Sequence, residues 1–141
     1  MDNIEVVYTG CFINPKKLEQ KIKKLERLPL KRTIERPHVT FEYKPSSVDF
    51  SLFGEKVSVT ATGYGNDGEN EGLFVTLETD NDSLKNLIKK IENPHITLSV
   101  SENGKPVNTK NLSSVPIEPI KMTAVFGAFV SGKGIVVTSA N

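Results

Sequence analysis

Two five-residue stretches share one pattern, Pro-His-Val-Thr-Phe at residues 37–41 and Pro-His-Ile-Thr-Leu at residues 94–98. They contain both histidines of the 141-residue chain, and a threonine follows each histidine two positions later. Successive side chains of a β-strand point to opposite faces, so residues two apart share a face. Each stretch is therefore predicted to be a strand that presents an imidazole and a hydroxyl side by side, with Val39 or Ile96 on the other face.

The sequence before the first stretch predicts a strand followed by a helix. Residues 4–13 are rich in β-branched and aromatic side chains, which favour a strand. Asn14 and Pro15 then supply a helix cap and a first helical position. The helix carries one apolar stripe: Leu18, Ile22 and Leu25. Pro29 predicts that it ends near Leu28.

The second stretch follows the same order of elements. Residues 56–64 alternate apolar and polar as a half-buried strand does, a glycine-rich turn follows, and residues 73–79 predict the next strand. A second helix carries its own stripe: Leu84, Leu87, Ile88 and Ile91. Leu18 and Leu84 are 66 residues apart, and so are the other matching stripe positions. We interpret this as an internal duplication, with pseudo-repeats at about 1–70 and 71–141.

The rest of the chain predicts a connection and a final hairpin. Residues 102–119 are polar and interrupted by prolines, and strands at 120–130 and 135–139 flank a Ser-Gly-Lys-Gly turn. Phe126 and Phe129 are three apart, so they are expected on opposite faces, one of them in the core. The fold class is therefore α+β.

Composition limits the possible functions. Hydrophobic residues make up 37% and charged residues 25%, which is typical of a soluble globular domain, and the length suits a single domain. The net charge of +1 argues against non-specific duplex DNA binding. No apolar run is long enough for a membrane span, and the N-terminus does not resemble a signal peptide. Cys11 is the only cysteine, which fits the reducing cytoplasm.

Two histidines in one motif can do chemistry that a lone structural histidine cannot. Free imidazole has a pKa of about 6.5, so near neutral pH one ring can be a neutral base and the other a protonated acid. Threonine hydroxyls can bind the oxygens of an anionic transition state. The combination favours in-line displacement at phosphorus, with no metal or cofactor.

Other chemistries have weaker support. Two histidines without a third ligand make a poor zinc site. There is no Gly-x-Ser-x-Gly elbow, and Cys11 lies in the middle of a predicted strand, where a small buried hydrophobic residue is the usual role. The glycines at residues 63–72 lack the Gly-Lys-[Ser/Thr] end of a phosphate-binding loop.

The paired His-x-Thr strands in a duplicated chain of this size resemble the two-histidine (2H, or LigT-like) phosphoesterase superfamily. The pentapeptides look most like its tRNA-ligase-type cyclic phosphodiesterase domains. The resemblance covers essentially the whole chain, 1–141, as a single domain. It implies two lobes, each a small antiparallel sheet with a helix, and a central cleft that carries both motifs.

The resemblance also implies a reaction. It is the metal-independent hydrolysis of 2′,3′-cyclic phosphates, on RNA 3′ ends or small nucleotides, to 2′-phosphates. His95 would activate water and His38 would protonate the departing 3′-oxygen. Thr40 and Thr97 would hold the phosphate.

Further residues could contact such a substrate. Lys31, Arg32 and Arg36 precede the first motif and could reach RNA phosphates, although a solvated run of charges is an equally good explanation. Three aromatic residues could stack on a base: Tyr8, Phe12 and Tyr43. Tyr43 lies at odd spacing from His38, so in a regular strand it would face away from the imidazole.

Alternative functions stay open. A related enzyme would open ADP-ribose 1″,2″-cyclic phosphate or cleave 2′-5′ oligoadenylate. A non-catalytic alternative is a single-stranded RNA-binding module, which has no evident reason to keep both histidines and both threonines. The sequence gives no sign of the oligomeric state.

Overall fold

The computed structural model describes residues 5–138, which form a mixed α+β domain dominated by antiparallel strands. Its elements, in chain order, are β1 (Val6–Phe12), α1 (Pro15–Lys21), β2 (Arg32–Thr33), β3 (His38–Tyr43), the 3-10 turn η1 (Phe50–Leu52), β4 (Lys56–Asn66), β5 (Asn70–Glu78), α2 (Asp82–Lys89), β6 (His95–Val100), the 3-10 turn η2 (Pro106–Asn111), β7 (Val115–Val130) and β8 (Gly134–Val136). Residues 4 and 139, the expected limits of the first and last strands, lie outside the described residues.

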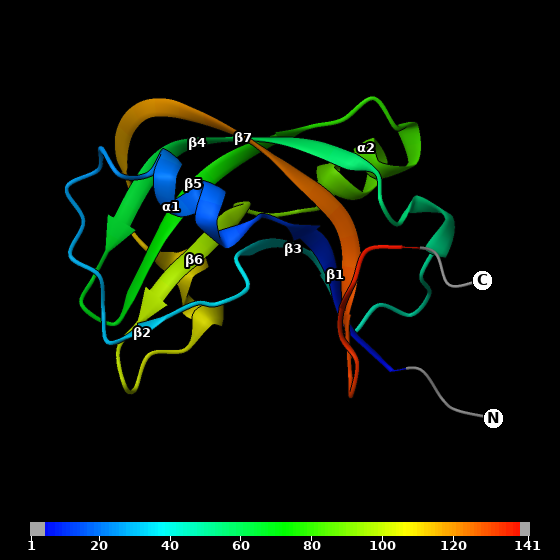
Figure 1. The fold of residues 1–141 in the computed structure, drawn as a ribbon, viewed down its shortest axis with the longest axis horizontal. Helices are drawn as coiled ribbons and strands as arrows, with labels where there is room; N and C mark the ends of the chain where they lie inside the picture. The colour runs from blue at the N-terminus through cyan, green and yellow to red at the C-terminus, as the bar shows by residue number, and fades with distance from the viewer. Residues whose placement is uncertain (1–4, 139–141) are drawn as a thin grey trace.

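The strands form one continuous sheet in the order β2-β6-β5-β4-β7-β1-β3, and β8 pairs with β7. The resemblance implies a small antiparallel sheet in each of two lobes, whereas in the structure β4 and β7 pair along most of β4 and join the two groups of strands into one sheet. Although β3 and β6 lie far apart in this order, their Cα atoms come within 8 Å of each other. The sheet therefore curves until these two strands approach each other below the arch of β4 and β7 (Figure 1).

The alternating sequence of residues 56–64 predicts a strand with one buried face, and β4 has this pattern. In β4, Val57, Val59 and Ala61 are fully buried, whereas the residues between them are more exposed. Phe126 of β7 is buried and Phe129 is only partly so, which confirms the expectation that they face opposite sides.

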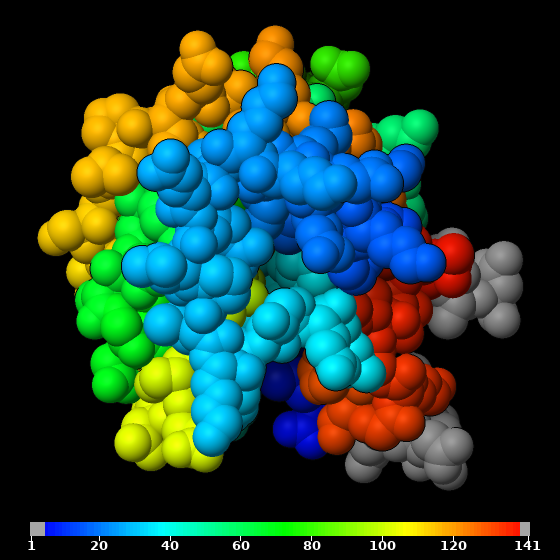
Figure 2. Space-filling view, turned by 60° about the vertical axis from the view of Figure 1, so that its left-hand side comes forward, coloured from blue at the N-terminus to red at the C-terminus, as the bar shows by residue number. Residues whose placement is uncertain are grey.

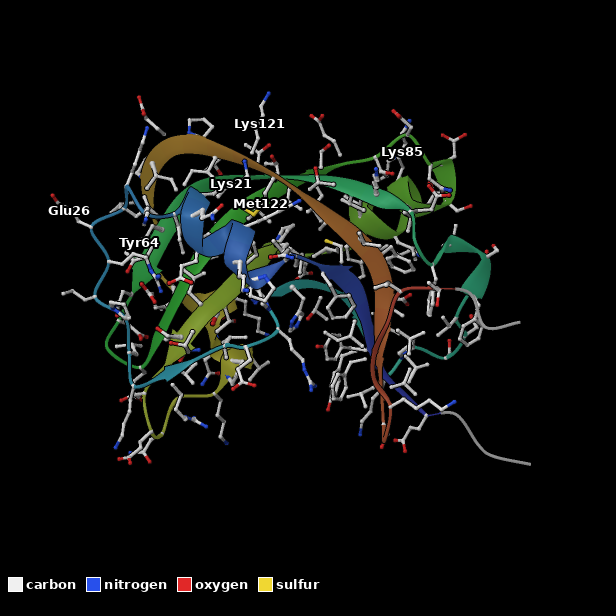
Figure 3. All side chains as sticks on the ribbon, viewed as in Figure 1. Lys21, Glu26, Tyr64, Lys85, Lys121 and Met122 are labelled. Atoms are coloured by element: carbon white, nitrogen blue, oxygen red, sulfur yellow. The ribbon has the colours of Figure 1, made fainter. Side chains whose placement is uncertain are left out.

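Asparagine side chains cap both α-helices. Asn14 accepts a hydrogen bond from the Lys17 amide, and Asn81 accepts one from the Leu84 amide. Each helix buries one leucine in the core, and α1 packs across β7 close to Met122 (Figure 3).

The first helix is shorter than predicted, because α1 ends at Lys21 and not near Leu28. Tertiary contacts explain the early end. Arg27 forms two hydrogen bonds to the buried Glu71, and the Leu30 amide donates to the Ser99 hydroxyl. The segment after α1 is thus held against the sheet, and Figure 2 shows it as a continuous band over that face.

The penultimate strand is longer than predicted. β7 begins before the expected range 120–130, and Pro116 and Pro119 lie inside it. Proline cannot donate to a ladder hydrogen bond, so it is confined to edges and irregular positions. The register between β7 and β4 shifts between Ala61 and Gly63, so Pro119 lies in the irregular stretch, and Pro116 pairs with Gly63 directly beyond it.

Candidate functional site

His38 and His95 occupy matching places in two pairs of antiparallel strands, β1–β3 and β5–β6. His38 pairs with Phe12 in the β1–β3 ladder, and His95 pairs with Phe74 in the β5–β6 ladder. The proline before each histidine makes the same contact with the neighbouring chain. The Pro37 carbonyl accepts from the Ile13 amide and the Pro94 carbonyl accepts from the Val75 amide, both at 3.0 Å.

A bulge follows each His-x-Thr motif. Thr40 pairs with Gly10 and Thr97 pairs with Gly72, and one residue after each threonine, Phe41 or Leu98, has no partner in the ladder. Such an extra residue bends its strand and increases the local twist.

Glycine is required opposite each threonine because the strands approach closely there. A β-carbon on Gly10 would lie 2.3 Å from the Val39 carbonyl oxygen, and one on Gly72 would lie 2.8 Å from that of Ile96. Both distances are shorter than real contacts of a β-carbon, so a side chain at either glycine would force the two strands apart.

The four residues of the two motifs come together. His38, Thr40, His95 and Thr97 all line one cleft of about 790 Å³. The rest of the lining is largely aromatic, apolar and basic: Tyr8, Ile34, Phe41, Tyr43, Lys90, Ile91, Glu92, Pro106, Val107 and Lys110. The cleft is large enough for a nucleotide-sized ligand.

Both imidazole rings are oriented in the same way. His38 Nδ1 lies 2.8 Å from the Arg36 carbonyl oxygen, and His95 Nδ1 lies 2.9 Å from that of Asn93. A carbonyl oxygen can only accept, so Nδ1 carries the hydrogen in both rings. Nε2 is then the nitrogen that each ring has available for chemistry, as a base when neutral and as an acid when protonated.

Burial lowers the pKa of both histidines below the usual 6.5. For His38, the hydrogen bond to the Arg36 carbonyl opposes this shift, and the charge of His95 adds to it. For His95, the bond to the Asn93 carbonyl opposes the shift, and the charge of Lys110 adds to it. Both rings are therefore mostly neutral at pH 7, and the pair resists holding two protons at once.

An aromatic stack supports His38. The Tyr8 ring lies 4.6 Å from the His38 ring at an angle of 22°, and 5.5 Å from the Phe129 ring at 5°. The Arg36 guanidinium lies over the Phe129 ring, 5.5 Å from its centroid. Burial raises the pKa of Tyr8, although the charge of Arg36 opposes the shift, so Tyr8 stays neutral.

Tyr43 faces the cleft, contrary to the expectation for a regular strand. The bulge at Phe41 adds one residue to β3, so Tyr43 pairs with Tyr8 and shares its face. Its side chain lines the cleft and the residue is 67% exposed, which leaves an aromatic ring accessible at this site.

The three basic residues proposed from the sequence have different surroundings. Lys31 forms an exposed ion pair with Glu102, and Arg32 donates to the carbonyl oxygens of Ser101 and Gly104. None of these three residues lines the cleft, but Arg36 lies beside the aromatic stack.

Two basic residues of the cleft were not predicted. Lys90 follows α2, and Lys110 belongs to η2, within a connection expected to be polar and irregular. In the sequence, Lys89-Lys90 repeats Lys23-Lys24 at the same offset of 66 residues as the apolar stripes, but this repeat does not indicate a place in the cleft. Nothing in the sequence near Lys110 indicates that η2 folds over β6.

The thiol of Cys11 is buried within β1. Burial raises the pKa of the Cys11 thiol to about 12, so this cysteine is a poor nucleophile. Within residues 5–138 no cluster of three or more His, Cys, Asp or Glu side chains is arranged to hold a metal ion. Over the same residues, no helix has the length and apolar character needed to cross a membrane.

No protein-family model matches this chain, and no curated protein matches it.

Proposed function

We propose that this chain is a metal-independent phosphodiesterase of the two-histidine type, which hydrolyses 2′,3′-cyclic phosphates to 2′-phosphates. One observation carries the proposal: two histidines with the same ring orientation line one cleft, each with a threonine two residues away. A general acid and a general base on one phosphate need this arrangement. The substrate would be the 3′ end of an RNA or a small cyclic nucleotide.

Internal duplication is part of the proposal. In both strand pairs a phenylalanine lies opposite the histidine, a glycine lies opposite the threonine, and a bulge follows the threonine. Matching hydrogen bonds from both proline carbonyls add to this likeness. We infer two pseudo-equivalent lobes, β1–α1–β3 and β5–α2–β6, that contribute one His-x-Thr motif each to the central cleft.

The reaction follows from this geometry. One histidine accepts a proton from water at Nε2 while the water oxygen forms a bond to phosphorus. The P–O3′ bond breaks on the opposite side, and the second histidine donates its Nε2 proton to the departing oxygen. The threonine hydroxyls donate to the non-bridging oxygens, whose charge grows in the transition state. The products are a 2′-phosphate and a free 3′-hydroxyl.

The rest of the cleft suits a nucleotide. Tyr43 offers an accessible ring on which a base could stack, and such stacking is largely independent of base identity. Lys90 and Lys110 supply positive charge for phosphates outside the reacting centre.

A direct assay tests the function. The purified protein is incubated with EDTA and either 2′,3′-cyclic nucleotides or a short RNA that ends in a cyclic phosphate. We expect turnover to the 2′-phosphate only. ADP-ribose 1″,2″-cyclic phosphate and 2′-5′ oligoadenylate serve as further substrates, and turnover of none of these compounds would refute the proposal. Reversible loss of activity on chelation would refute the metal-independent reaction.

Two variants test the histidine pair. His38→Ala and His95→Ala are each expected to lower kcat by about 10²–10⁴-fold, the usual contribution of a general acid or base. Both side chains line the cleft rather than fill the core, so the variants should remain folded. A rate close to wild type in either folded variant would contradict acid–base catalysis by the pair.

A further inference from the structure

The hydroxyl of Thr97 belongs to a hydrogen-bonded network, and the corresponding place beside Thr40 in the β1–β3 strand pair holds different residues. Its Oγ1 lies 2.8 Å from Thr109 Oγ1 and 3.3 Å from the Pro106 carbonyl oxygen, and both partners belong to η2. Asn70 precedes Gly72, the partner of Thr97, by two residues. In the β1–β3 strand pair the matching position is taken by Tyr8, whose ring stacks on His38.

Asn70 determines the direction of this network. Asn70 is almost fully buried, and its Nδ2 lies 2.7 Å from the Lys105 carbonyl oxygen and 3.0 Å from Thr109 Oγ1. A carbonyl oxygen only accepts, so the amide must direct its NH₂ group to it. The second hydrogen of that group is donated to Thr109, whose hydroxyl oxygen is therefore an acceptor.

Thr109 must in turn donate to another group. It is 0% exposed, so its hydroxyl hydrogen needs an acceptor inside the protein. The 2.8 Å contact joins two hydroxyl groups, and either of them can donate. Donation from Thr97 would leave the buried hydrogen of Thr109 without an acceptor among residues 5–138, so the direction that satisfies both residues is from Thr109 to Thr97 Oγ1. Thr97 then accepts from Thr109, and its own single hydrogen is free to be donated elsewhere.

The Thr97 hydrogen has two possible acceptors. The Pro106 carbonyl lies at 3.3 Å, which is long for a bond between a hydroxyl and a carbonyl. Thr97 also lines the cleft, where an anionic phosphate oxygen would accept a shorter and stronger bond.

We propose that Thr109 is a positioning residue, which together with Asn70 directs the Thr97 hydroxyl hydrogen toward a non-bridging oxygen of the bound phosphate. This inference rests on the proposed function and deepens it, because it makes Thr97 the better prepared donor of the two threonines. Thr109 acts through Thr97 and does not itself touch the substrate.

Thr109 also has a packing role that the test must separate. A β-carbon on Gly72 would lie 2.4 Å from the Thr109 methyl carbon, so this methyl group fills the space above the glycine. Thr109→Val keeps the shape of the side chain and loses the hydroxyl. Thr109→Ser keeps the hydroxyl and loses the methyl group. The relay and the packing role therefore predict opposite orders of damage.

The test measures kcat and KM for a 2′,3′-cyclic nucleotide at a temperature where thermal melts show every variant folded. We expect Thr109→Val to lower kcat by about 10-fold or more, the typical effect of a lost hydrogen bond to a charged group. Thr109→Ser should stay within about twofold of wild type, because it retains the bond. Thr76→Val, on the exposed side of β5, controls for the same chemical change away from the cleft. If Thr109→Val matches wild type, or if both variants lose activity only in proportion to their stability, the relay is wrong.

A second readout does not depend on turnover. Inorganic phosphate is titrated while the NMR signals of His95 are followed. We expect Thr109→Val to bind phosphate about 10-fold more weakly than Thr109→Ser. Equal affinity of the two variants, or no phosphate binding by the wild type, overturns the relay. Absence of turnover by the wild type refutes the proposed function, and the phosphate titration then decides the relay alone.

Discussion

His38 and His95 make the same backbone contact, since Nδ1 of each ring donates to the carbonyl oxygen two residues earlier, at 2.8 Å and 2.9 Å respectively. The contact selects one tautomer for both rings, and it persists when Nε2 gains a proton. A proton can therefore be taken up or released at Nε2 without rotation of either ring. The pH dependence of the reaction should reflect this pair.

We expect a bell-shaped pH dependence of kcat/KM with both apparent pKa values below 6.5, because burial lowers the pKa of each histidine. The rate rises with pH as the base loses its proton, and falls at higher pH as the acid loses its own. A bound anionic phosphate favours the imidazolium form, so both limbs of the kcat profile should lie at higher pH than those of kcat/KM. Initial rates across a pH series give both profiles, and a kcat/KM optimum on the alkaline side of neutrality would contradict the expectation.

Packing favours His95 as the acid, the reverse of the roles that the resemblance implies. Aromatic rings lie closer to His38, with Tyr8 at 4.6 Å and Phe12 at 5.7 Å, than Phe74 does to His95 at 6.4 Å. The more enclosed ring loses its proton first, because desolvation disfavours the charged form. We therefore expect His95 to hold the proton that the pair shares.

A substrate with an activated leaving group separates the two roles. A nitrophenyl phosphodiester needs no protonation of its leaving oxygen, so it should restore most of the activity of the variant that lacks the acid. We expect this recovery for His95→Ala and not for His38→Ala, by comparison of kcat/KM on the activated and the cyclic substrates. Recovery of His38→Ala alone would support the assignment that the resemblance implies.

Lys110 is expected to act on both the histidine and the substrate. Its charge lowers the pKa of His95, so Lys110→Gln should raise that pKa, as measured by NMR titration of the two histidines. It should also raise KM for a short RNA more than for a cyclic mononucleotide, because only the RNA has further phosphates to contact. Lys121→Gln, outside the cleft lining, is the matched control (Figure 3). Equal effects of the two substitutions would mean that Lys110 has no specific role.

The sequence predicts those parts of the site that depend on local backbone geometry. Residues two apart share a face of any strand, so the pairing of His38 with Thr40, and of His95 with Thr97, follows from spacing alone. The orientation of Tyr43 does not, because it depends on a bulge and on the close approach of two strands.

The parts that could not be predicted depend on contacts between distant residues. Thr109 is brought behind Thr97 by Asn70, which is 39 residues away from it in the chain. The polar connection that contains Thr109 has no periodicity to indicate this. The joining of both strand groups into one sheet likewise depends on the β4–β7 ladder, and alternation within a strand shows which face is buried but not which strand is its neighbour.

Arg27 provides a test of stability outside the cleft. Its guanidinium donates to both carboxylate oxygens of Glu71, which is 0% exposed and also accepts from Ser99 and Tyr64. We expect Arg27→Met to lower the free energy of unfolding by about 3 kcal/mol, because it leaves a buried carboxylate without its counter-charge. Lys23→Met, at an exposed position of the same segment, should change it by less than about 0.5 kcal/mol. Urea denaturation at neutral pH measures both.

The free energy of unfolding that Arg27→Met loses should also depend on pH. Burial alone would raise the pKa of Glu71, but the hydrogen bonds from Arg27, Ser99 and Tyr64 outweigh it and lower the pKa below 4.5. A carboxyl group with a lowered pKa in the folded state stabilises the protein above its unfolded pKa and loses this contribution as pH falls through its folded pKa. Without Arg27 the carboxyl can be protonated more easily, so the difference between Arg27→Met and wild type should narrow on acidification. A penalty that stays constant under acid conditions would mean that Arg27 stabilises the segment after α1 by packing and not through the charge of Glu71.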